Sequence, residues 1–432
     1  MMHERAKGRR LDGRMAVVVG AGRSGQAASR LLVELGASVR LVDRNPDSVR
    51  GEFRDWAESA RVDLALGEHH GAQFSDADMV VMSPGAPVAT FEPLFPANRD
   101  LDVMAETELA ARYVMEPVIG ITGTNGKTTT ASLTAHMLRY SGRSVFLGGN
   151  IGTPLSEYVL KDDRVDVVVL ELSSFQLMTC TTFRPWVGVL LNFSPDHLDY
   201  HSDLDEYWQS KLLLFANQHE DDLAVVHADL QQRFLDERPT PARTIFYRAK
   251  QRFAHFKLLG AHNQENMEAA YQACRFFGVT ENEAQGAIRD FEPLDHRIAP
   301  VAEIDGVLYV NDSKATTVDA LRVALKSFDR PVLLLAGGVY KGGDLADLTP
   351  LMQDKVRAVG LFGGAEDTFR EAWNGDFDVT WDEHLHDAVK RLKAKAREGD
   401  VVLLSPATAS FDQYSNYMAR GRDFTRIVEE LA

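Results

Sequence analysis

The segment PVIGITGTNGKTTT, residues 117–130, places an apolar run directly before a glycine-containing loop and the start of a helix. Gly123 and Gly126 keep the loop open, so that backbone amides can point at phosphate oxygens. Lys127 can then reach the β and γ phosphates of a nucleotide, and the Thr128 hydroxyl can bind Mg²⁺. A strand-to-helix turn that binds nothing is the alternative. We interpret the segment as a phosphate loop.

The common phosphate-loop pattern has its first glycine where Ile121 stands, and we interpret Ile121 as the end of the preceding strand. An ATP site also needs a carboxylate at the end of a neighbouring strand. The run VDVVVLE, residues 165–171, supplies Glu171 directly after its apolar positions. A solvated acid at a strand end is the alternative. Together the loop and the acid predict ATP or GTP hydrolysis or transfer.

Short β-branched runs recur along the chain, each followed by a longer helical stretch. Near-continuous apolar strands that alternate with helices are typical of parallel sheets covered on both faces, which predicts an α/β fold. The runs are MAVVV (15–19), SVRLV (38–42), DMVVM (78–82), PVIGIT (117–122), SVFLG (144–148), VDVVVLEL (165–172), VGVLLN (187–192), LAVVH (223–227), PVLLLAG (331–337), VRAVGLF (356–362) and DVVLLS (400–405).

The chain of 432 residues is too long for one ordinary core. Periodicity lapses and prolines appear at residues 93–102 and in FEPLDHR, residues 291–297. We therefore expect three domains, at residues 1–100, 101–294 and 295–432.

The composition limits the class of protein. Apolar residues make up 45% and charged residues 25%, and no apolar run approaches the ~18 residues that a membrane span needs. The first fourteen residues, MMHERAKGRRLDGR, lack the apolar core of a secretory signal, and the chain has two cysteines. The net charge of −16 argues against broad binding to nucleic acid or anionic membranes. We expect a soluble, monomeric, cytoplasmic protein.

A second glycine loop follows the first apolar run. Gly20, Gly22 and Gly25 have G-x-G-x-x-G spacing, and Asp43 ends the next strand. This context is typical of dinucleotide binding, because glycines let the backbone approach a diphosphate and the acid can bind a hydroxyl. NAD(P), another diphosphate such as a nucleotide sugar, and a turn without a ligand remain open. SPGAP, residues 83–87, offers a second turn at the same sheet edge.

Further motifs narrow the interpretation: ELSSFQL (171–177), DHLDYHSDLDEYWQSK (196–211), GAHNQENMEAA (260–270), DHRIAP (295–300), NDSKATT (311–317), GGVYKGGDL (337–345) and SPATASFDQYSNYMARGRDF (405–424). Together with GTNGKT, they resemble the Mur ligases of peptidoglycan synthesis along essentially the whole chain. The resemblance implies a Rossmann-like N-terminal domain, a central domain like the phosphate-loop ATPases and a Rossmann-like C-terminal domain.

Within the family, ELSSFQL, NDSKAT and SPATASFDQY resemble the members that add D-glutamate. The resemblance implies that ATP phosphorylates the carboxylate of UDP-N-acetylmuramoyl-L-alanine (UDP-MurNAc-L-Ala), and that the amine of D-glutamate then attacks the acyl phosphate. It also implies that the N-terminal domain binds the UDP part rather than NAD. The C-terminal domain is expected to close over ATP held by the central domain.

The resemblance assigns site residues position by position. The implied UDP-sugar contacts are Arg23, Ser24, Asp43, Arg44, Ser83, Gly85, Asn150, Ser173 and Gln176. The implied ATP contacts are Gly123, Thr124, Asn125, Gly126, Lys127, Thr128, Thr129, Asn266, Arg297 and Asp312. The implied D-glutamate contacts are Thr316, Lys341, Ser410, Phe411 and Tyr417.

The chemistry of these positions fits the implied reaction. Carboxylate activation develops negative charge on the phosphoryl group, which Lys127, Lys314, Arg297 and magnesium can stabilise. The distal carboxylate of glutamate needs a cation, which Lys341 can supply, with hydrogen bonds from Ser410 and Thr316.

The resemblance further implies two magnesium ions held by Thr128, Glu171, His197 and Lys211, although in the family the histidine that matches His197 contacts either the second metal or the substrate. Histidine is an unusual magnesium ligand, and a helical lysine is most often solvated. In the family the matching lysine is carbamylated by CO₂, which replaces a repelling ammonium with an anionic oxygen ligand. We therefore expect Lys127, His197, Lys211 and Lys314 to be the catalytic residues.

Two positions depart from the family pattern. Tyr340 stands where relatives often carry a polar residue, and Thr317 stands where Asn is expected. A related ligase for another amino acid is one alternative. An NAD(P)-binding oxidoreductase or sensor, based on GAGRSG, is another, but it leaves Lys127 and Glu171 without a role.

Overall fold

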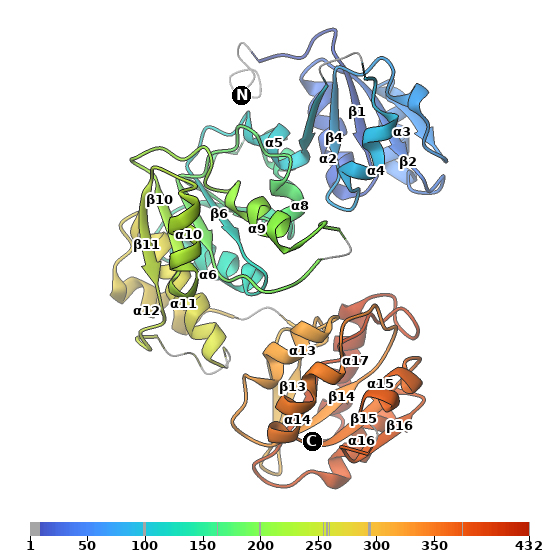
Figure 1. Cartoon of the computed structure of the whole chain (residues 1–432), viewed down its shortest axis with the longest axis vertical. Helices are drawn as coiled ribbons and strands as arrows, with labels where there is room; N and C mark the ends of the chain where they lie inside the picture. The colour runs from blue at the N-terminus through green and yellow to red at the C-terminus, as the bar shows by residue number, and fades with distance from the viewer. Residues whose placement is uncertain are drawn as a thin grey trace. The chain divides into compact units, whose positions relative to one another are not determined.

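The structure is a computed structural model of the chain. It describes residues 9–97, 101–161, 163–197, 200–253, 255, 258, 260–292, 295–373 and 375–431. Most of the basic N-terminal segment, residues 1–8, lies outside the described residues. The described chain forms separate sheets with helices packed on them (Figure 1), which confirms the α/β fold.

The N-terminal sheet has the strand order β3-β2-β1-β4-β5, and all its pairs are parallel. The central strand β1 is almost completely buried because the run MAVVV is apolar on both faces. The strands are β1 (Met15–Val19), β2 (Ser38–Asp43), β3 (Asp63–Leu66), β4 (Met79–Met82) and β5 (Asp102–Ala105). The helices are α2 (Arg23–Glu34), α3 (Gly51–Ser59), α4 (Val88–Phe91) and α5 (Glu106–Ala111).

The central sheet has the strand order β11-β10-β9-β6-β8-β7, again with parallel pairs only. The strands are β6 (Val118–Thr122), β7 (Val145–Gly149), β8 (Val167–Glu171), β9 (Val187–Leu190), β10 (Leu223–His227) and β11 (Arg243–Tyr247). The helices are α6 (Lys127–Tyr140), α7 (Leu155–Leu160), α8 (Ser174–Leu177), α9 (Leu204–Leu212), α10 (Gln231–Glu237), α11 (Ala261–Arg275) and α12 (Glu281–Asp290).

The C-terminal sheet has the strand order β12-β13-β17-β14-β15-β16, and its first pair, β12 with β13, is antiparallel. The sequence predicts neither this hairpin nor the strands β3, β5, β11 and β16. The strands are β12 (Ala299–Ile304), β13 (Val307–Asn311), β14 (Val332–Ala336), β15 (Val356–Phe362), β16 (Val379–Asp382) and β17 (Val401–Leu404). The helices are α13 (Val318–Leu325), α14 (Thr349–Lys355), α15 (Glu366–Trp373), α16 (Leu385–Lys395) and α17 (Tyr417–Glu429).

The described residues divide into two compact units. The first takes the chain up to Ala249 together with Asn266–Ala287, and the second takes Lys250–Glu265 and the residues from Ile288 onward. The N-terminal and central sheets belong to the first unit because one apolar cluster continues through both, from Leu31 to Trp208. The expected boundaries after residues 100 and 294 stay predictions. None of the helices in the described part of the chain combines the length and the apolarity needed to cross a bilayer.

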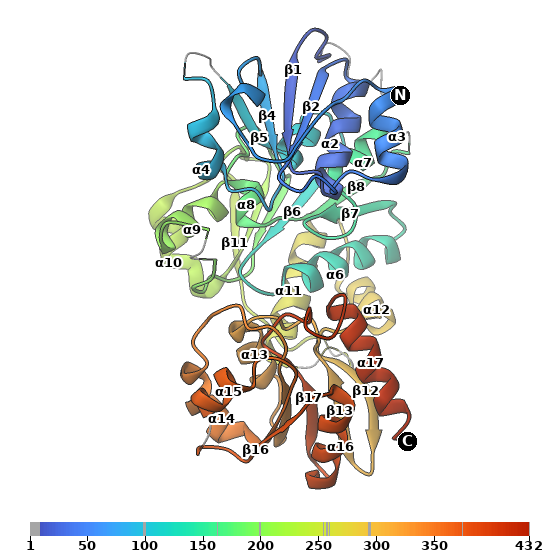
Figure 2. The same cartoon turned by 90° about the vertical axis from the view of Figure 1, so that its right-hand side faces the viewer.

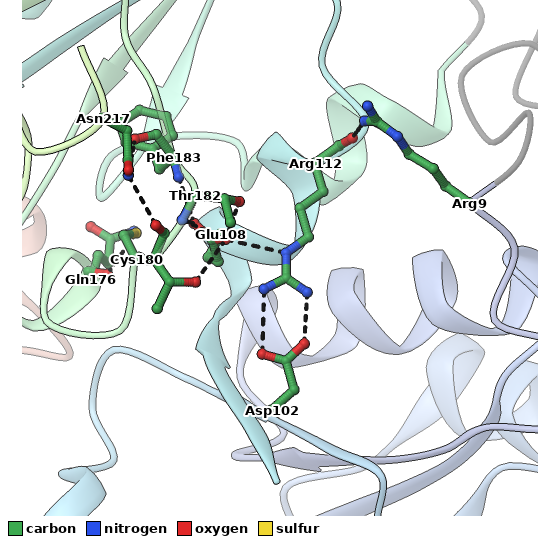
Figure 3. Close-up of polar contacts among 10 residues, drawn as sticks. Arg9, Asp102, Glu108, Arg112, Gln176, Cys180, Thr182, Phe183 and Asn217 are labelled. Carbon is green, nitrogen blue, oxygen red and sulfur yellow. Dashed lines mark hydrogen bonds and ion pairs between the residues drawn. The ribbon is translucent and has the colours of Figure 1, made fainter. Parts of the chain in front are cut away.

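Two features fasten the N-terminal sheet to the central one. Helix α2 packs against α7, as the turned view shows (Figure 2). Helix α5 carries the buried Glu108, whose carboxylate accepts bonds from the backbone amides of Thr182 (3.1 and 3.2 Å) and Phe183 (2.9 Å). Figure 3 shows Arg112 between two acids, at 3.2 Å from Glu108 and 2.7 Å from Asp102. These charge-assisted bonds hold α5 in one orientation.

Candidate active site

The first glycine loop lies between β1 and α2, as the sequence predicts. Gly20 has φ +92°, a conformation that favours glycine. A Cβ on Gly25 would lie 1.8 Å from the carbonyl oxygen of Gly20, so the helix can approach the loop this closely only without a side chain. The Ser83 hydroxyl donates a 3.2 Å bond to the Gly20 carbonyl, which joins the loop to the turn after β4.

A cavity of about 580 Å³ opens at this loop. It is lined by most of the positions that the resemblance assigns to the UDP-sugar. These lining residues are Arg23, Ser24, Asp43, Arg44, Ser83 and Gly85. The size fits a nucleotide-sized ligand, and the glycine backbone suits a diphosphate.

Asp43, at the end of β2, is held by the backbone around it. Its Oδ2 accepts a 2.7 Å bond from the Ala21 amide, and its Oδ1 accepts a 2.8 Å bond from the Asn45 amide. A carboxylate has about four acceptor positions, so acceptor capacity remains for a ligand hydroxyl. The acid is therefore oriented toward the cavity by the loop that it stabilises.

The cavity also has a wall that the sequence does not predict. His69 and Phe91 line it, with their ring centroids 5.1 Å apart. Burial lowers the pKa of His69, and the positive charge of Arg44 lowers it further, so the imidazole is neutral at neutral pH. His69 follows the unpredicted edge strand β3, and the only signal in the sequence is the pair His69-His70. An aromatic wall with a neutral ring suits the planar base of a nucleotide.

The second glycine loop lies between β6 and α6 and has the backbone of a phosphate loop. Gly123 has φ +153° and Gly126 has φ +82°. The Lys127 ammonium donates 2.8 Å bonds to the carbonyls of Gly123 and Thr124, so that it lies folded over the loop. Thr128 is the second residue of α6 and is buried. Ile121 is the fourth residue of β6, as interpreted from the sequence.

Neighbouring side chains fix this loop from both sides. The amide of Asn125 donates to Asn192 Oδ1 at 2.8 Å, and Asn192 Nδ2 donates back to the Asn125 carbonyl at 3.0 Å. Thr130, in the first turn of α6, donates a 3.3 Å bond to Asn266 Oδ1 of α11. A Cβ on Gly126 would lie 2.3 Å from the same oxygen. The structure therefore brings Asn266 to the phosphate loop, where the resemblance assigns it.

Glu171 ends β8, the strand beside β6. Its Oε1 accepts a 2.8 Å bond from Asn150 Nδ2. Its Oε2 is buried and has no hydrogen-bond partner among the described residues. A buried, unpartnered carboxylate oxygen at this strand end fits an oxygen-preferring cation such as Mg²⁺. No cluster of three His, Cys, Asp or Glu side chains suited to a metal occurs in the described ranges, so Thr128 and the nucleotide would have to complete the shell.

Lys211, in α9, has 1% of its surface exposed. Its ammonium donates a 3.1 Å bond to the Gly123 carbonyl and lies 4.2 Å from the centroid of the Tyr207 ring. Burial lowers the pKa of Lys211 well below its ordinary value, and the nearby charge of Lys127 lowers it further. A buried amine with a lowered pKa at the phosphate loop differs from the solvated lysine that a helix usually carries.

His197 lies on the loop before α9 with φ +57°. Its Nε2 is 3.5 Å from Asp196 Oδ2, and its ring centroid is 4.8 Å from that of Phe175. A second histidine, His201, was missed in the sequence. It is buried, it contacts the Ser174 hydroxyl at 2.9 Å, and burial lowers its pKa. Its Nδ1 also lies 3.6 Å from Glu206 Oε2, so His201 joins the segment before α9 to both α8 and α9.

The segment ELSSFQL holds two further assigned residues in a local network. Gln176 Oε1 accepts from the amide and hydroxyl of Ser173, each at 3.1 Å, which forms the capping box of α8. Gln176 Nε2 donates a 3.1 Å bond to Thr107 Oγ1 of α5. Both groups of the Gln176 amide are thus used inside the protein.

In the second unit, three assigned residues lie together at the ends of β12 and β13. Asp312 accepts bonds from the Ile298 amide (3.2 Å) and the Ser405 hydroxyl (2.8 Å), and burial raises its pKa to about 7. The Lys314 amide donates a 3.0 Å bond to the His296 carbonyl. His296 and Ile298, on either side of Arg297, have φ +64° and +47°. Such strain in a β-branched residue is typical of functional sites.

The residues assigned to D-glutamate lie on loops after β13, β14 and β17, except for Tyr417, which is the first residue of α17. A bridge between Val339 and Ala409, with bonds of 2.8 and 2.9 Å, joins the last two loops. It brings Lys341 to within 5.7 Å of the Phe411 ring centroid, and Phe411 is 68% exposed. The remaining positions are the buried Ser410, the half-buried Thr316 before α13, and Tyr417, whose ring centroid lies 4.2 Å from the Lys314 ammonium.

The two residues that differ from the family pattern, Thr317 and Tyr340, make local hydrogen bonds. Thr317 caps α13 by accepting a 3.3 Å bond from the Ala320 amide. The Tyr340 hydroxyl donates to the carbonyl of Gly343.

Comparison with known proteins finds Mur ligase relatives along essentially the whole chain. Three family models match: "Mur ligase MurD-like, N-terminal domain" at residues 14–104, "Mur ligase middle domain" at 121–258 and "Mur ligase, glutamate ligase domain" at 296–408. A UDP-N-acetylmuramoylalanine–D-glutamate ligase from Nitratidesulfovibrio vulgaris is 55% identical over 430 residues, 99% of each chain. One from Desulfosudis oleivorans is 40% identical and covers 97% of each chain.

Solved structures share the fold. The MurF ligase from Thermotoga maritima in complex with ADP has a TM-score of 0.62 at 18% identity, covering 91% of this chain and 96% of its own. A pseudomurein peptide ligase type C from Methanothermus fervidus has a TM-score of 0.57 at 16% identity, covering 97% and 100%. The full-length identity to the first relatives goes further than the fold: the chain belongs to the Mur ligase family, with the UDP-N-acetylmuramoylalanine–D-glutamate ligases.

Proposed function

We propose that this protein joins D-glutamate to UDP-MurNAc-L-Ala at the expense of ATP, in the cytoplasmic synthesis of peptidoglycan precursors. The proposal is carried by two neighbouring features: the phosphate loop after β6 carries Lys127, and the adjacent strand β8 ends in Glu171 with an unpartnered buried oxygen. The cavity at the first glycine loop, about 580 Å³, supports a nucleotide-sugar substrate. Full-length relatives that carry this name support the choice of D-glutamate.

The reaction has two steps. A carboxylate oxygen of the L-alanyl group attacks the γ-phosphorus of ATP, the bond to the bridging oxygen breaks, and ADP leaves. The neutral amine of D-glutamate then attacks the acyl carbon, phosphate leaves with the electrons of the C–O bond, and the nitrogen loses a proton. Lys127 would stabilise negative charge on the transferring group, and we assign the same role to Arg297 and Lys314.

Thr128 and Glu171 are the residues that we expect to hold Mg²⁺, which would neutralise charge on the phosphates. The unpartnered Oε2 of Glu171 supports this assignment. Asn150, bonded to the other oxygen at 2.8 Å, would keep the carboxylate in one orientation. For a second ion we assign His197 and a carbamate on Lys211.

The lowered pKa of Lys211 supports the carbamate, because a neutral amine is the form that reacts with CO₂. The nitrogen forms a bond to carbon and releases a proton, and the product has an anionic oxygen. The matching test is the variant Lys211→Ala, which removes the amine. Short carboxylic acids should restore part of its activity by supplying the missing oxygen ligand, and no rescue at any concentration would contradict the carbamate.

D-glutamate would be held by its distal carboxylate at Lys341, with Ser410 and Thr316 as hydrogen-bond donors and Phe411 and Tyr417 beside it. The bridge between the loops after β14 and β17 supports this grouping. We also propose that the protein acts as a monomer.

The test is ADP release from the purified protein with UDP-MurNAc-L-Ala, ATP, Mg²⁺ and one amino acid at a time. ADP release with D-glutamate but not with L-lysine, diaminopimelate or L-alanine is the expected result. A response to one of the other amino acids would replace D-glutamate as substrate. Tight NADH binding that UDP does not displace would instead support an oxidoreductase or sensor.

A further inference from the structure

Arg23 lines the nucleotide cavity and also bonds to helix α7 and to the loop that precedes it. Its Nε and Nη2 donate to the two oxygens of Glu157, at 3.0 and 3.2 Å. Its Nη1 donates a 2.7 Å bond to the Gly152 carbonyl, and Nη2 is 3.5 Å from the Thr153 hydroxyl. One side chain therefore links the first glycine loop to the segment Gly149–Thr153.

The same segment positions the acid that we assign to the metal. The Asn150 amide donates a 2.8 Å bond to the Glu171 carbonyl, and Asn150 Nδ2 donates a 2.8 Å bond to Glu171 Oε1. The Gly149 amide closes the segment on the Thr153 carbonyl at 3.2 Å. A Cβ on Gly149 would lie 2.3 Å from the Glu171 carbonyl oxygen, so this strand end is closely packed. Gly152, which accepts a bond from Arg23, is therefore only two residues from Asn150, which bonds to the Glu171 carboxylate.

Arg23 also keeps donor capacity for a ligand. A guanidinium has five N–H groups, and the contacts above use four of them, so one N–H of Nη1 remains among the described residues. The side chain is 59% exposed, and Glu157 is 29% exposed. A diphosphate at the glycine loop would attract this guanidinium and restrict its motion.

We propose that Arg23 is a positioning residue that couples occupancy of the nucleotide cavity to the loop Gly149–Thr153, and through Asn150 to the Glu171 carboxylate. A bound diphosphate orders Arg23, Arg23 orders the loop, and the loop holds the carboxylate in the orientation that binds the metal–nucleotide complex. The inference rests on the proposed function. It goes beyond that function by assigning cooperation between two binding sites to one ion pair.

Coupling between two sites is reciprocal. UDP must therefore strengthen the binding of the magnesium complex of a non-hydrolysable ATP analogue by the same factor by which that complex strengthens the binding of UDP. Because the pair Arg23–Glu157 is partly exposed, this factor should be modest, about three- to fivefold.

The experiment is isothermal titration of each ligand with and without the other, on the full chain. Glu157→Gln removes the charge that anchors Arg23, and it should lower the coupling factor to about one while leaving each ligand's own affinity unchanged. Arg23→Lys replaces the two-nitrogen fork on Glu157 with a single nitrogen, so it should lose the coupling and also weaken UDP binding. The matched control is Glu58→Gln, which breaks an exposed Arg54–Glu58 pair of 3.2 Å and should leave the coupling unchanged.

The outcomes separate the inference from the proposed function. Loss of coupling in Glu157→Gln but not in Glu58→Gln supports the role of Arg23. Equal coupling in the parent and Glu157→Gln, or no coupling in the parent, overturns it while leaving the ligase activity in place. Failure of UDP to bind the parent chain at all would overturn both.

Discussion

Lys211 offers a direct measure of the electrostatics at the phosphate loop. Its side chain is 1% exposed, and burial together with Lys127 lowers its pKa well below the ordinary value of 10.5. Between the lowered pKa of the folded chain and the ordinary pKa of the unfolded chain, the unfolded chain binds more protons at this position than the folded chain does. The free energy of unfolding of the parent therefore rises with pH through this range, by about 1.4 kcal/mol per pH unit from this one group.

The variant Lys211→Met removes the titrating group and keeps an unbranched side chain. Its free energy of unfolding lacks this contribution, so the parent should gain stability relative to the variant as the pH rises toward 10.5, by up to about 1.4 kcal/mol per pH unit. Urea unfolding, followed by tryptophan fluorescence in buffers free of CO₂, measures the difference. Trp208, fully buried in the same helix, reports on the region.

The control is Lys161→Met, which removes an exposed lysine after α7. Its stability should follow the parent at every pH. If the free energy of unfolding of Lys211→Met also follows that of the parent at every pH, Lys211 is protonated as readily in the folded chain as in the unfolded chain. That result would refute the lowered pKa that supports the carbamate assignment.

Three further variants test the proposed metal site and the first glycine loop. Glu171→Gln keeps an acceptor for Asn150 but removes the negative charge of the carboxylate. The rate of ADP release should therefore fall about 100-fold, and a magnesium titration should show a higher Mg²⁺ requirement. Unchanged activity would contradict the metal assignment. Gly25→Ala places a methyl group 1.8 Å from the Gly20 carbonyl and should destabilise the protein by about 1–3 kcal/mol in thermal unfolding. Gly22→Ala, where a Cβ meets nothing within 4 Å, should keep stability but weaken UDP binding, and equal stability losses in the two variants would argue against the close approach.

The sequence predicts the inner strands of the three sheets well and the outer ones poorly. Buried strands such as β14, with the run VLLLA, are apolar at every position because helices cover both faces. The edge strands β3, β11 and β16 are partly exposed and carry polar residues, so their patterns do not stand out. The inner strand β13 was missed because it follows β12 through a hairpin at Asp305-Gly306, outside the strand–helix rhythm.

The candidate site also has parts that the sequence predicts and parts that it does not predict. Loops that depend on glycine leave a mark in the sequence, and both glycine loops lie where the sequence predicts them. The cavity wall combines His69, from a connecting segment, with Phe91, the last residue of the short helix α4, and the positions of both depend on tertiary packing. The pair Arg23–Glu157 joins residues 134 positions apart, and nothing in the local pattern of either residue indicates the other.

The hydrogen bonds of Glu108 limit how the chain can be recombined with its relatives. Glu108 holds Thr182 and Phe183, residues 74 and 75 positions downstream, and Arg112 ties the same helix back to Asp102 (Figure 3). A chimaera that takes its nucleotide-sugar domain from another ligase and joins it between the first two sheets would separate these partners. The natural crossover unit is therefore discontinuous: residues 102–112 have to be exchanged together with residues 181–184.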